Sequence, residues 1–213
     1  MEKVNIVIGR FQPFTTGHYK CVEAAWNQKG LPTVICMINV PESKLDLKHP
    51  FPSDALVELY GTLFKGNPKI AGVFPIQSAD IVKAGQMLRE FGFEIAAWTC
   101  GTDRYPDYSS KAIKYHDRAG LSDDFEMICV DRDMDAVDNV SATKVRECLL
   151  NDDRERFLSM IPMSTSDGDI LYNALQPYIY RIYGKTEIRS HKMFKRLTLE
   201  DRVSRLERLL KYK

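Results

Sequence analysis

The residues of this chain best suited to chemistry lie in GRFQPFTTGH, residues 9–18, which directly follow the apolar run VNIVI. A short β-branched run that ends at a glycine is typical of a buried strand in a parallel sheet. Gly9 has no Cβ, so a ligand phosphate can approach the backbone closely there. A helix is expected over about residues 17–28, with His18 in its first turn. The segment therefore indicates an anion site that carries Arg10 and His18.

The start of a helix favours an anion because its first amide N–H groups are unpaired and its dipole is positive there. That dipole contributes about 0.3–1 kcal/mol, whereas one well-placed donor to a developing oxyanion contributes about 3–4 kcal/mol. Catalysis at this turn would therefore depend mostly on Arg10 and His18. The alternative is an ordinary strand–turn–helix connection with a surface histidine, so this segment alone does not decide the function.

A second segment of similar character is VSATKVREC, residues 140–148. Ser141 is expected to cap a helix, and Thr143, Lys144 and Arg146 then fall in its first turns, where their donors and charges add to the field of the helix start. Such a cluster suits a triphosphate. Taken alone, the segment also fits an ordinary capped surface helix with solvated basic side chains.

Together the two segments resemble the signatures of the nucleotidylyltransferase superfamily, which includes nicotinamide mononucleotide adenylyltransferases, phosphopantetheine adenylyltransferase and cytidylyltransferases. The H/T-x-G-H signature stands here as Thr15-Thr16-Gly17-His18, and the I-S-x-T-x-I-R pattern stands at residues 140–146. The resemblance covers roughly residues 1–162 and is strongest to nicotinamide mononucleotide adenylyltransferases.

This resemblance implies that an acceptor phosphate attacks the α-phosphorus of a nucleoside triphosphate in line and that pyrophosphate leaves, without a covalent enzyme intermediate. The protein would contribute mainly positioning and charge stabilisation. Mg²⁺ would accompany the triphosphate, held largely by phosphates and water, and no metal ligand from the protein is expected. Thr15 takes the place of a histidine found in many members, and its hydroxyl cannot carry a positive charge.

Carried over by position, the resemblance assigns contact with the α-phosphate to His18 and the β- and γ-phosphates to Lys144 and Arg146. The implied catalytic residues are His18, Arg10, Lys144 and Arg146. The implied nucleotide-binding residues are Gly9, Phe11, Thr15, Gly17, His18, Gly101, Asp103, Arg104, Ser141, Thr143, Lys144 and Arg146.

The middle of the chain alternates apolar runs with segments able to form helices. The runs TVICMIN, IAGVFPI, EIAAWTC and EMICV are separated by expected helices at 53–65, 79–91 and 109–119. This alternation predicts an α/β fold, a Rossmann-like doubly wound parallel sheet of about five strands with a helical C-terminal extension. Ligands bind such sheets beyond the carboxyl ends of the strands, so both segments should meet there. The expected division is a catalytic domain at 1–162 and an extension at 163–213.

Two further loops are expected at the same edge. In CGTDRYPDYSS, residues 100–110, Gly101, Asp103 and Arg104 would contact nucleotide or acceptor, or else form a solvated turn. Trp98, just before this loop, is a further candidate for contact with the acceptor.

The second loop is NVPESKLDLKHPFPSD, residues 39–54. It resembles the N-P-F-T segment of archaeal-type nicotinamide mononucleotide adenylyltransferases, with His49 in place of asparagine. Lys44 and Lys48 could lend charge to an acceptor phosphate. Alternatively, the two prolines of this loop only set the entry to a helix capped by Ser53.

Composition agrees with an intracellular enzyme. The chain has 213 residues, with 30 basic and 29 acidic side chains and a formal charge of +1, so nothing demands a nucleic-acid partner. The five cysteines lack C-x-x-C spacing and are expected to be reduced thiols without a zinc site. No secretory signal or bilayer-spanning stretch is expected, which favours a cytoplasmic setting.

The C-terminal fifty residues have a different character. ILYNALQPYIYRIYG, residues 170–184, is expected to be a helix that Pro177 kinks or divides and that packs on the catalytic domain. Residues 181–196 carry six Lys or Arg against one Glu and suggest a solvated linker or, as the alternative, a contact with an acidic partner or nucleic acid. LTLEDRVSRLERLLKYK, residues 197–213, predicts a short amphipathic helix that docks on its own domain or, as favoured here, on another subunit to form a homo-oligomer.

The sequence thus predicts an ATP:nicotinamide mononucleotide adenylyltransferase with ATP and a phosphorylated small molecule as substrates. A CTP-using cytidylyltransferase is the alternative within the same superfamily. A non-catalytic assembly protein that retains the fold is the alternative of another class.

Overall fold

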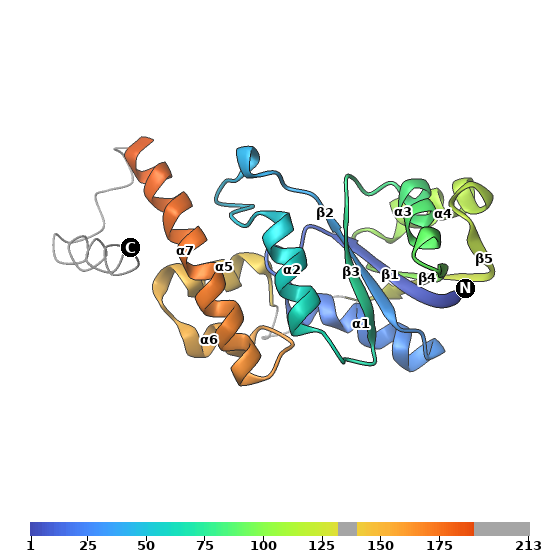
Figure 1. The fold of residues 1–213 in the computed structure, drawn as a ribbon, viewed down its shortest axis with the longest axis horizontal. Coiled ribbons are helices and arrows are strands. Elements are labelled where there is room, and N and C mark those ends of the chain that lie inside the picture. Colours follow the sequence, from blue (N-terminus) through green and yellow to red (C-terminus); the bar gives the residue numbers. More distant parts are fainter. Residues whose placement is uncertain (132–139, 190–213) are drawn as a thin grey trace.

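In the computed structural model, which describes residues 1–131 and 140–189, the chain forms a five-stranded sheet with helices on both faces (Figure 1). The strand order is β3-β2-β1-β4-β5, and every neighbouring pair is parallel. This confirms the predicted Rossmann-like, doubly wound α/β fold. The strands are β1 (Glu2–Gly9), β2 (Thr33–Ile38), β3 (Ile70–Ile76), β4 (Phe93–Gly101) and β5 (Leu121–Val130).

The helices fill the expected intervals and then continue past the sheet. The prediction that the fourth helix starts near residue 109 is wrong, because Pro106 occupies the first turn of a helix that already begins at Tyr105. A short 3₁₀ turn, η1 (Glu42–Lys44), was not predicted. The helices are α1 (Thr16–Lys29), α2 (Ser53–Leu63), α3 (Ile81–Glu90), α4 (Tyr105–Ala119), α5 (Ala142–Asn151), α6 (Arg154–Ser159) and α7 (Thr165–Arg189).

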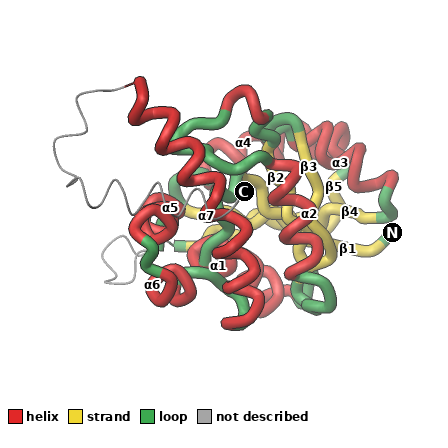
Figure 2. The backbone as a smooth tube through the Cα atoms, turned by 60° about the vertical axis from the view of Figure 1, so that its left-hand side comes forward, coloured by secondary structure: helices red, strands yellow, loops and turns green. Residues whose placement is uncertain are grey.

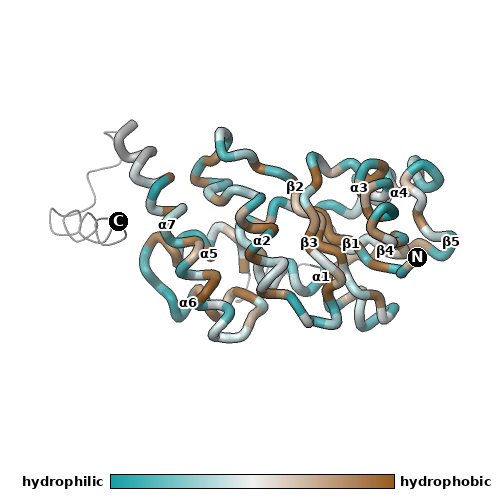
Figure 3. The backbone as a smooth tube through the Cα atoms, viewed as in Figure 1, coloured by the Kyte–Doolittle hydropathy of each residue, from teal (hydrophilic) through white to brown (hydrophobic). Residues whose placement is uncertain are grey.

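Alternation along the strands produces two main cores, one on each face of the sheet, beside a small third cluster of Ala25, Ala97 and Ile128. In β2, Val34 and Cys36 pack with α3 and α4 on one face of the sheet, whereas Ile35 and Met37 pack with α1, α2 and α5–α7 on the other. Helices therefore lie on both sides of the strands (Figure 2), and the strands form the most hydrophobic part of the chain trace (Figure 3). Burial on both faces explains why the strand sequences are almost continuously apolar.

Helix α7 joins the larger core rather than forming a separate layer. Its Leu171, Leu175 and Ile179 are buried in the same cluster as α2 and α5. The predicted division of this helix at Pro177 is wrong, because α7 continues through the proline to Arg189. Residues 181–189 therefore belong to a helix rather than to a linker. Residues 190–196 and the expected terminal helix at 197–213 lie outside the described residues, so self-association through that helix stays a prediction.

Two other expectations concern the chain as a whole. The structure describes all five cysteines, and all except Cys129 are buried, as predicted for core residues. Among the helices that the structure describes, none has both the length and the apolar character needed to cross a membrane.

Candidate active site

A cavity of about 1250 Å³ opens at the carboxyl edge of the sheet. Residues that follow β1, β2, β3 and β4 line it, together with the first residues of α1 and α5. The chain crosses from one side of β1 to the other at this point, because β1 lies between β2 and β4. Ligands of doubly wound proteins bind at such a switch point. The structure thus brings the two predicted segments to one site.

Gly17 allows the starts of α1 and α5 to lie against each other. A Cβ added at Gly17 would lie 3.2 Å from the carbonyl oxygen of Val140, tighter than nine in ten contacts of real Cβ atoms. Arg146 adds a second connection, since its Nη1 donates to the carbonyl oxygen of Gln12 at 2.7 Å and its Nη2 donates to Thr143 Oγ1 at 3.0 Å. The two segments are therefore joined through backbone contacts.

The imidazole of His18 is oriented by the first turn of its own helix. The backbone N–H of Thr15 donates to His18 Nδ1 at 3.0 Å, and Thr15 Oγ1 lies 3.0 Å from the same nitrogen. Because Nδ1 accepts a hydrogen bond, we assign the proton of the neutral ring to Nε2. Thr15 lines the cavity but is only 1% exposed. Its main role at the site is therefore to hold the His18 ring in place.

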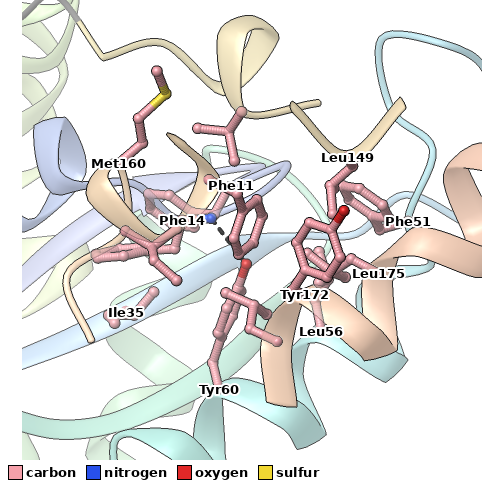
Figure 4. Packing of buried hydrophobic residues seen from close by; sticks show 14 of the residues in the cluster. Phe11, Phe14, Ile35, Phe51, Leu56, Tyr60, Leu149, Met160, Tyr172 and Leu175 are labelled. Carbon is pink, nitrogen blue, oxygen red and sulfur yellow. Dashed lines mark hydrogen bonds between the residues drawn. The ribbon is translucent and has the colours of Figure 1, made fainter. Parts of the chain in front are cut away.

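Two aromatic rings fix the position of the His18 side chain. The rings of Phe11 and Phe14 have centroids 5.1 and 5.4 Å from that of the imidazole. Phe14 N donates to the buried hydroxyl of Tyr60 at 2.9 Å (Figure 4). A Cβ on Gly9 would lie 2.9 Å from Phe11 Cε1, so a side chain at this position would require the Phe11 ring to move.

Gln12 is a central residue of the site that sequence reasoning missed. Its side chain is buried and pairs with the backbone of Phe51, donating to the carbonyl oxygen at 2.8 Å and accepting from N–H at 3.0 Å. Its own carbonyl oxygen accepts the hydrogen bond from Arg146. The available signal was a polar residue placed between two aromatics inside the first segment.

The loop after β2 supplies basic side chains to the cavity, as predicted for Lys44 and Lys48. The same loop contributes His49 and Asp46, which were not predicted as site residues. Burial and the neighbouring cations hold the pKa of His49 below its ordinary value. Ser53 does not cap α2, because its hydroxyl accepts from Val40 N at 2.7 Å and so closes the base of this loop.

The connection from β4 to α4 forms the opposite side of the cavity. Asp103 and Arg104 line it as predicted and pair with each other at 3.4 Å. Gly101 ends β4, is buried, and is not among the lining residues. Trp98 as an acceptor contact is a wrong prediction, because the alternation of β4 turns its side chain into the core, where it is fully buried and stacks on Tyr108 with centroids 4.3 Å apart.

Ser141 caps α5 as predicted, with its hydroxyl accepting from the backbone N–H of Lys144 at 3.2 Å. Ser141, Thr143 and Arg146 line the cavity, whereas Lys144 is half-buried on the same helix and is not among the lining residues. Burial lowers the pKa of Arg146, although a guanidinium keeps its charge at neutral pH.

The charges that line the cavity are predominantly positive, although the whole chain is almost neutral. Low-dielectric walls of one charge sign concentrate the field inside a cleft, so the arrangement favours an anionic ligand. The seven basic residues are Arg10, Lys20, Lys44, Lys48, Arg104, Lys111 and Arg146, and the three acidic residues are Asp46, Asp103 and Asp107.

We compared the chain with protein-family models, solved structures and curated proteins. A family model described as cytidylyltransferase-like matches residues 6–148. The fold is similar to that of Plasmodium falciparum nicotinic acid mononucleotide adenylyltransferase complexed with NaAD, with a TM-score of 0.50 and 15% identity over 84% of this chain and 98% of that chain. It is also similar to Thermotoga maritima TmcAL bound with alpha-thio ATP, with a TM-score of 0.50 and 12% identity over 85% of this chain and 56% of that chain. No curated protein matches the chain.

The family model covers more than half of the chain and includes both segments that form the cavity. At the low identities of the solved structures, their similarity supports the fold alone. The protein therefore belongs to the cytidylyltransferase-like family and is a member of the nucleotidylyltransferase superfamily that resembles nicotinamide mononucleotide adenylyltransferases.

Proposed function

We propose that this nucleotidylyltransferase transfers the adenylyl group of ATP to the phosphate of nicotinamide mononucleotide and releases pyrophosphate. The observation that carries the proposal is the convergence of both signature segments on one cationic cavity, with His18 oriented at its wall. The cavity can hold two phosphorylated ligands together, since its volume exceeds the 300–1,000 Å³ of most small-molecule sites.

In this reaction the protein acts by holding positively charged and hydrogen-bond-donating side chains beside the phosphates. His18 Nε2–H donates to a non-bridging oxygen of the α-phosphate as the acceptor phosphate attacks, and Arg10 and Arg146 stabilise the negative charge that moves toward the pyrophosphate. Lys144 contributes from the same turn of α5. Each donor is worth most where water is excluded and where it needs no reorientation during the reaction. An acceptor phosphate is already a dianion near neutral pH, so the attack needs no general base.

The residues fit Mg²⁺ that enters as part of the triphosphate substrate. Each cavity carboxylate has a partner: Asp46 accepts backbone N–H bonds, Asp103 pairs with Arg104, and Asp107 pairs with Lys111. Among the residues that the structure describes, no group of three metal-ligating side chains occurs. Phosphate oxygens and water would therefore supply most ligands of the ion, which would offset triphosphate charge.

Support for the adenylyl reaction comes from the related fold of the Plasmodium enzyme, whose structure contains NaAD. A cytidylyltransferase is the second candidate, because the matching family model is described as cytidylyltransferase-like. A non-catalytic assembly protein fits less well, since Arg10, His18, Lys144 and Arg146 are all present.

Pyrophosphate release distinguishes these candidates. The purified chain is incubated with ATP or CTP, each with and without nicotinamide mononucleotide or nicotinic acid mononucleotide, and products are identified by mass spectrometry. We expect acceptor-dependent pyrophosphate and a dinucleotide with ATP. Activity with CTP alone would overturn the adenylyl assignment, and no pyrophosphate with any pair would favour the non-catalytic alternative.

A further inference from the structure

His49 lies at the cavity between a carboxylate and a guanidinium, outside both signature segments. Its Nδ1 is 3.3 Å from Asp46 Oδ1, and its Nε2 is 3.4 Å from Arg10 Nη1. The carboxylate is fixed, because the same Oδ1 accepts backbone N–H bonds from Lys48 at 2.9 Å and from His49 at 2.6 Å. The imidazole is 20% exposed, so the loop holds it at the wall of the cavity.

These partners determine which ring nitrogen of His49 carries the proton. A guanidinium can only donate, so Nε2 accepts from Arg10 and the proton of the neutral ring lies on Nδ1, directed at Asp46. A second proton would place an N–H on Nε2 facing the donors of Arg10. That N–H then needs a different acceptor, and an anion bound in the cavity would provide one.

The charges around His49 change when an anion binds. Burial is the largest cause of its lowered pKa, and Arg10, Lys48 and Arg146 lower it further, whereas Asp46 raises it. A phosphate bound among these three cations offsets their charge, so the pKa of His49 rises on binding. Asp46 is already placed to stabilise the imidazolium through Nδ1–H.

We propose that His49 is a phosphate-binding residue that takes up a proton from solvent as the substrate binds and exchanges its contact with Arg10 for one with a phosphate oxygen. The inference rests on the proposed function, because it requires a phosphorylated substrate in this cavity. By linkage, the contribution of His49 to affinity increases as the pH falls from 8 to 6.

Isothermal titration calorimetry in buffers of different ionisation enthalpy measures this proton uptake. MgATP and nicotinamide mononucleotide are titrated separately, at pH 7, into the wild-type protein, His49→Gln and His116→Gln. His116 is the matched control, since its Nδ1 lies 3.2 Å from Asp117 Oδ1 outside the cavity. We expect the wild type and His116→Gln to take up the same fraction of a proton on binding. His49→Gln should take up less, because it lacks the imidazole. The ligand with the larger difference identifies which phosphate His49 contacts.

The pH dependence gives a second measurement. Protonation of the ligand affects the wild type and His49→Gln equally, so it cancels in the ratio of their affinities. We expect this ratio to rise toward pH 6. A tenfold rise in the affinity ratio would correspond to an increase of about one unit in the pKa of His49 on binding. Asp46→Asn can still accept the backbone N–H bonds but lacks the charge that favours the imidazolium, so its affinity curve should move to lower pH.

His49→Asn serves as a second variant if the glutamine variant does not fold. Equal proton uptake by the wild type and both variants, with both ligands bound, would overturn the role of His49 and leave the proposed function intact. Failure of the wild type to bind either ligand would overturn both.

Discussion

Two walls of the same cavity are constructed in different ways. The motif wall, residues 9–18 and 140–146, is tied together by hydrogen bonds to backbone atoms, through His18, Gln12 and Arg146. The α4 wall consists of Asp103, Arg104, Asp107 and Lys111, whose side chains are 38–65% exposed and pair mainly with one another.

This difference separates two tasks within one site. Backbone-anchored donors keep their positions before a substrate arrives, which is what stabilisation of a developing charge requires. Exposed ion pairs contribute little to stability and exchange partners easily, which suits recognition of a ligand. We therefore expect changes in the motif wall to affect turnover or folding, and changes in the α4 wall to affect substrate affinity.

The largest effect is expected for His18→Ala. The loss of an oriented donor to the α-phosphate should lower kcat on the order of 10²–10³, while ATP binding persists. Steady-state pyrophosphate release and calorimetric ATP binding check this, with His116→Ala as a control outside the cavity. An unchanged turnover number would remove His18 from catalysis.

Gln12→Ala should mainly reduce stability. It leaves the buried N–H and carbonyl groups of Phe51 without partners, so we expect the free energy of unfolding to fall by about 2–3 kcal/mol. Urea denaturation measures the change. Gln77→Ala, an exposed residue lining the same cavity, should change it by less than about 0.5 kcal/mol. Similar losses in both variants would contradict the special role of the motif wall.

The smallest effect is expected in the α4 wall. Arg104→Ala should raise the KM of one substrate by about threefold to tenfold, because it removes one solvent-screened charge, and should leave thermal stability unchanged. Kinetics with ATP and acceptor varied in turn identify the substrate. Arg118→Ala, near the other end of the helix that Arg104 precedes and outside the cavity, is the control. A loss of kcat without a change in KM would show that both walls serve the chemistry.

The strands were predictable from the sequence because burial on both faces leaves continuous apolar runs. The largest error is in β5, which begins at Leu121 rather than near Glu126 and whose register with β4 shifts between these two residues. The polar SDDF stretch in this interval concealed the first half of the strand.

Within the site, local patterns were more predictable than tertiary contacts. The cap by Ser141 and the position of His18 depend on neighbours within three residues, so the sequence contains their signals. The pairing of Gln12 with Phe51 depends on a loop 39 residues away, and no local pattern encodes it. Trp98 directly precedes a loop that lines the cavity, but its strand face directs its side chain into the core.

The contacts between α5 and α7 have a consequence for how the protein is made. Asp152, at the end of α5, accepts hydrogen bonds from Tyr172 at 2.9 Å and Gln176 at 2.7 Å, and Leu149 of α5 lies beside Tyr172 and Leu175 (Figure 4). During synthesis the sheet and α1 leave the ribosome well before α7, so α5 at first has no surface to dock against on that side. The contacts that hold α5 on this side, and with it the cavity residues Thr143 and Arg146, can therefore form only after α7 has been synthesised.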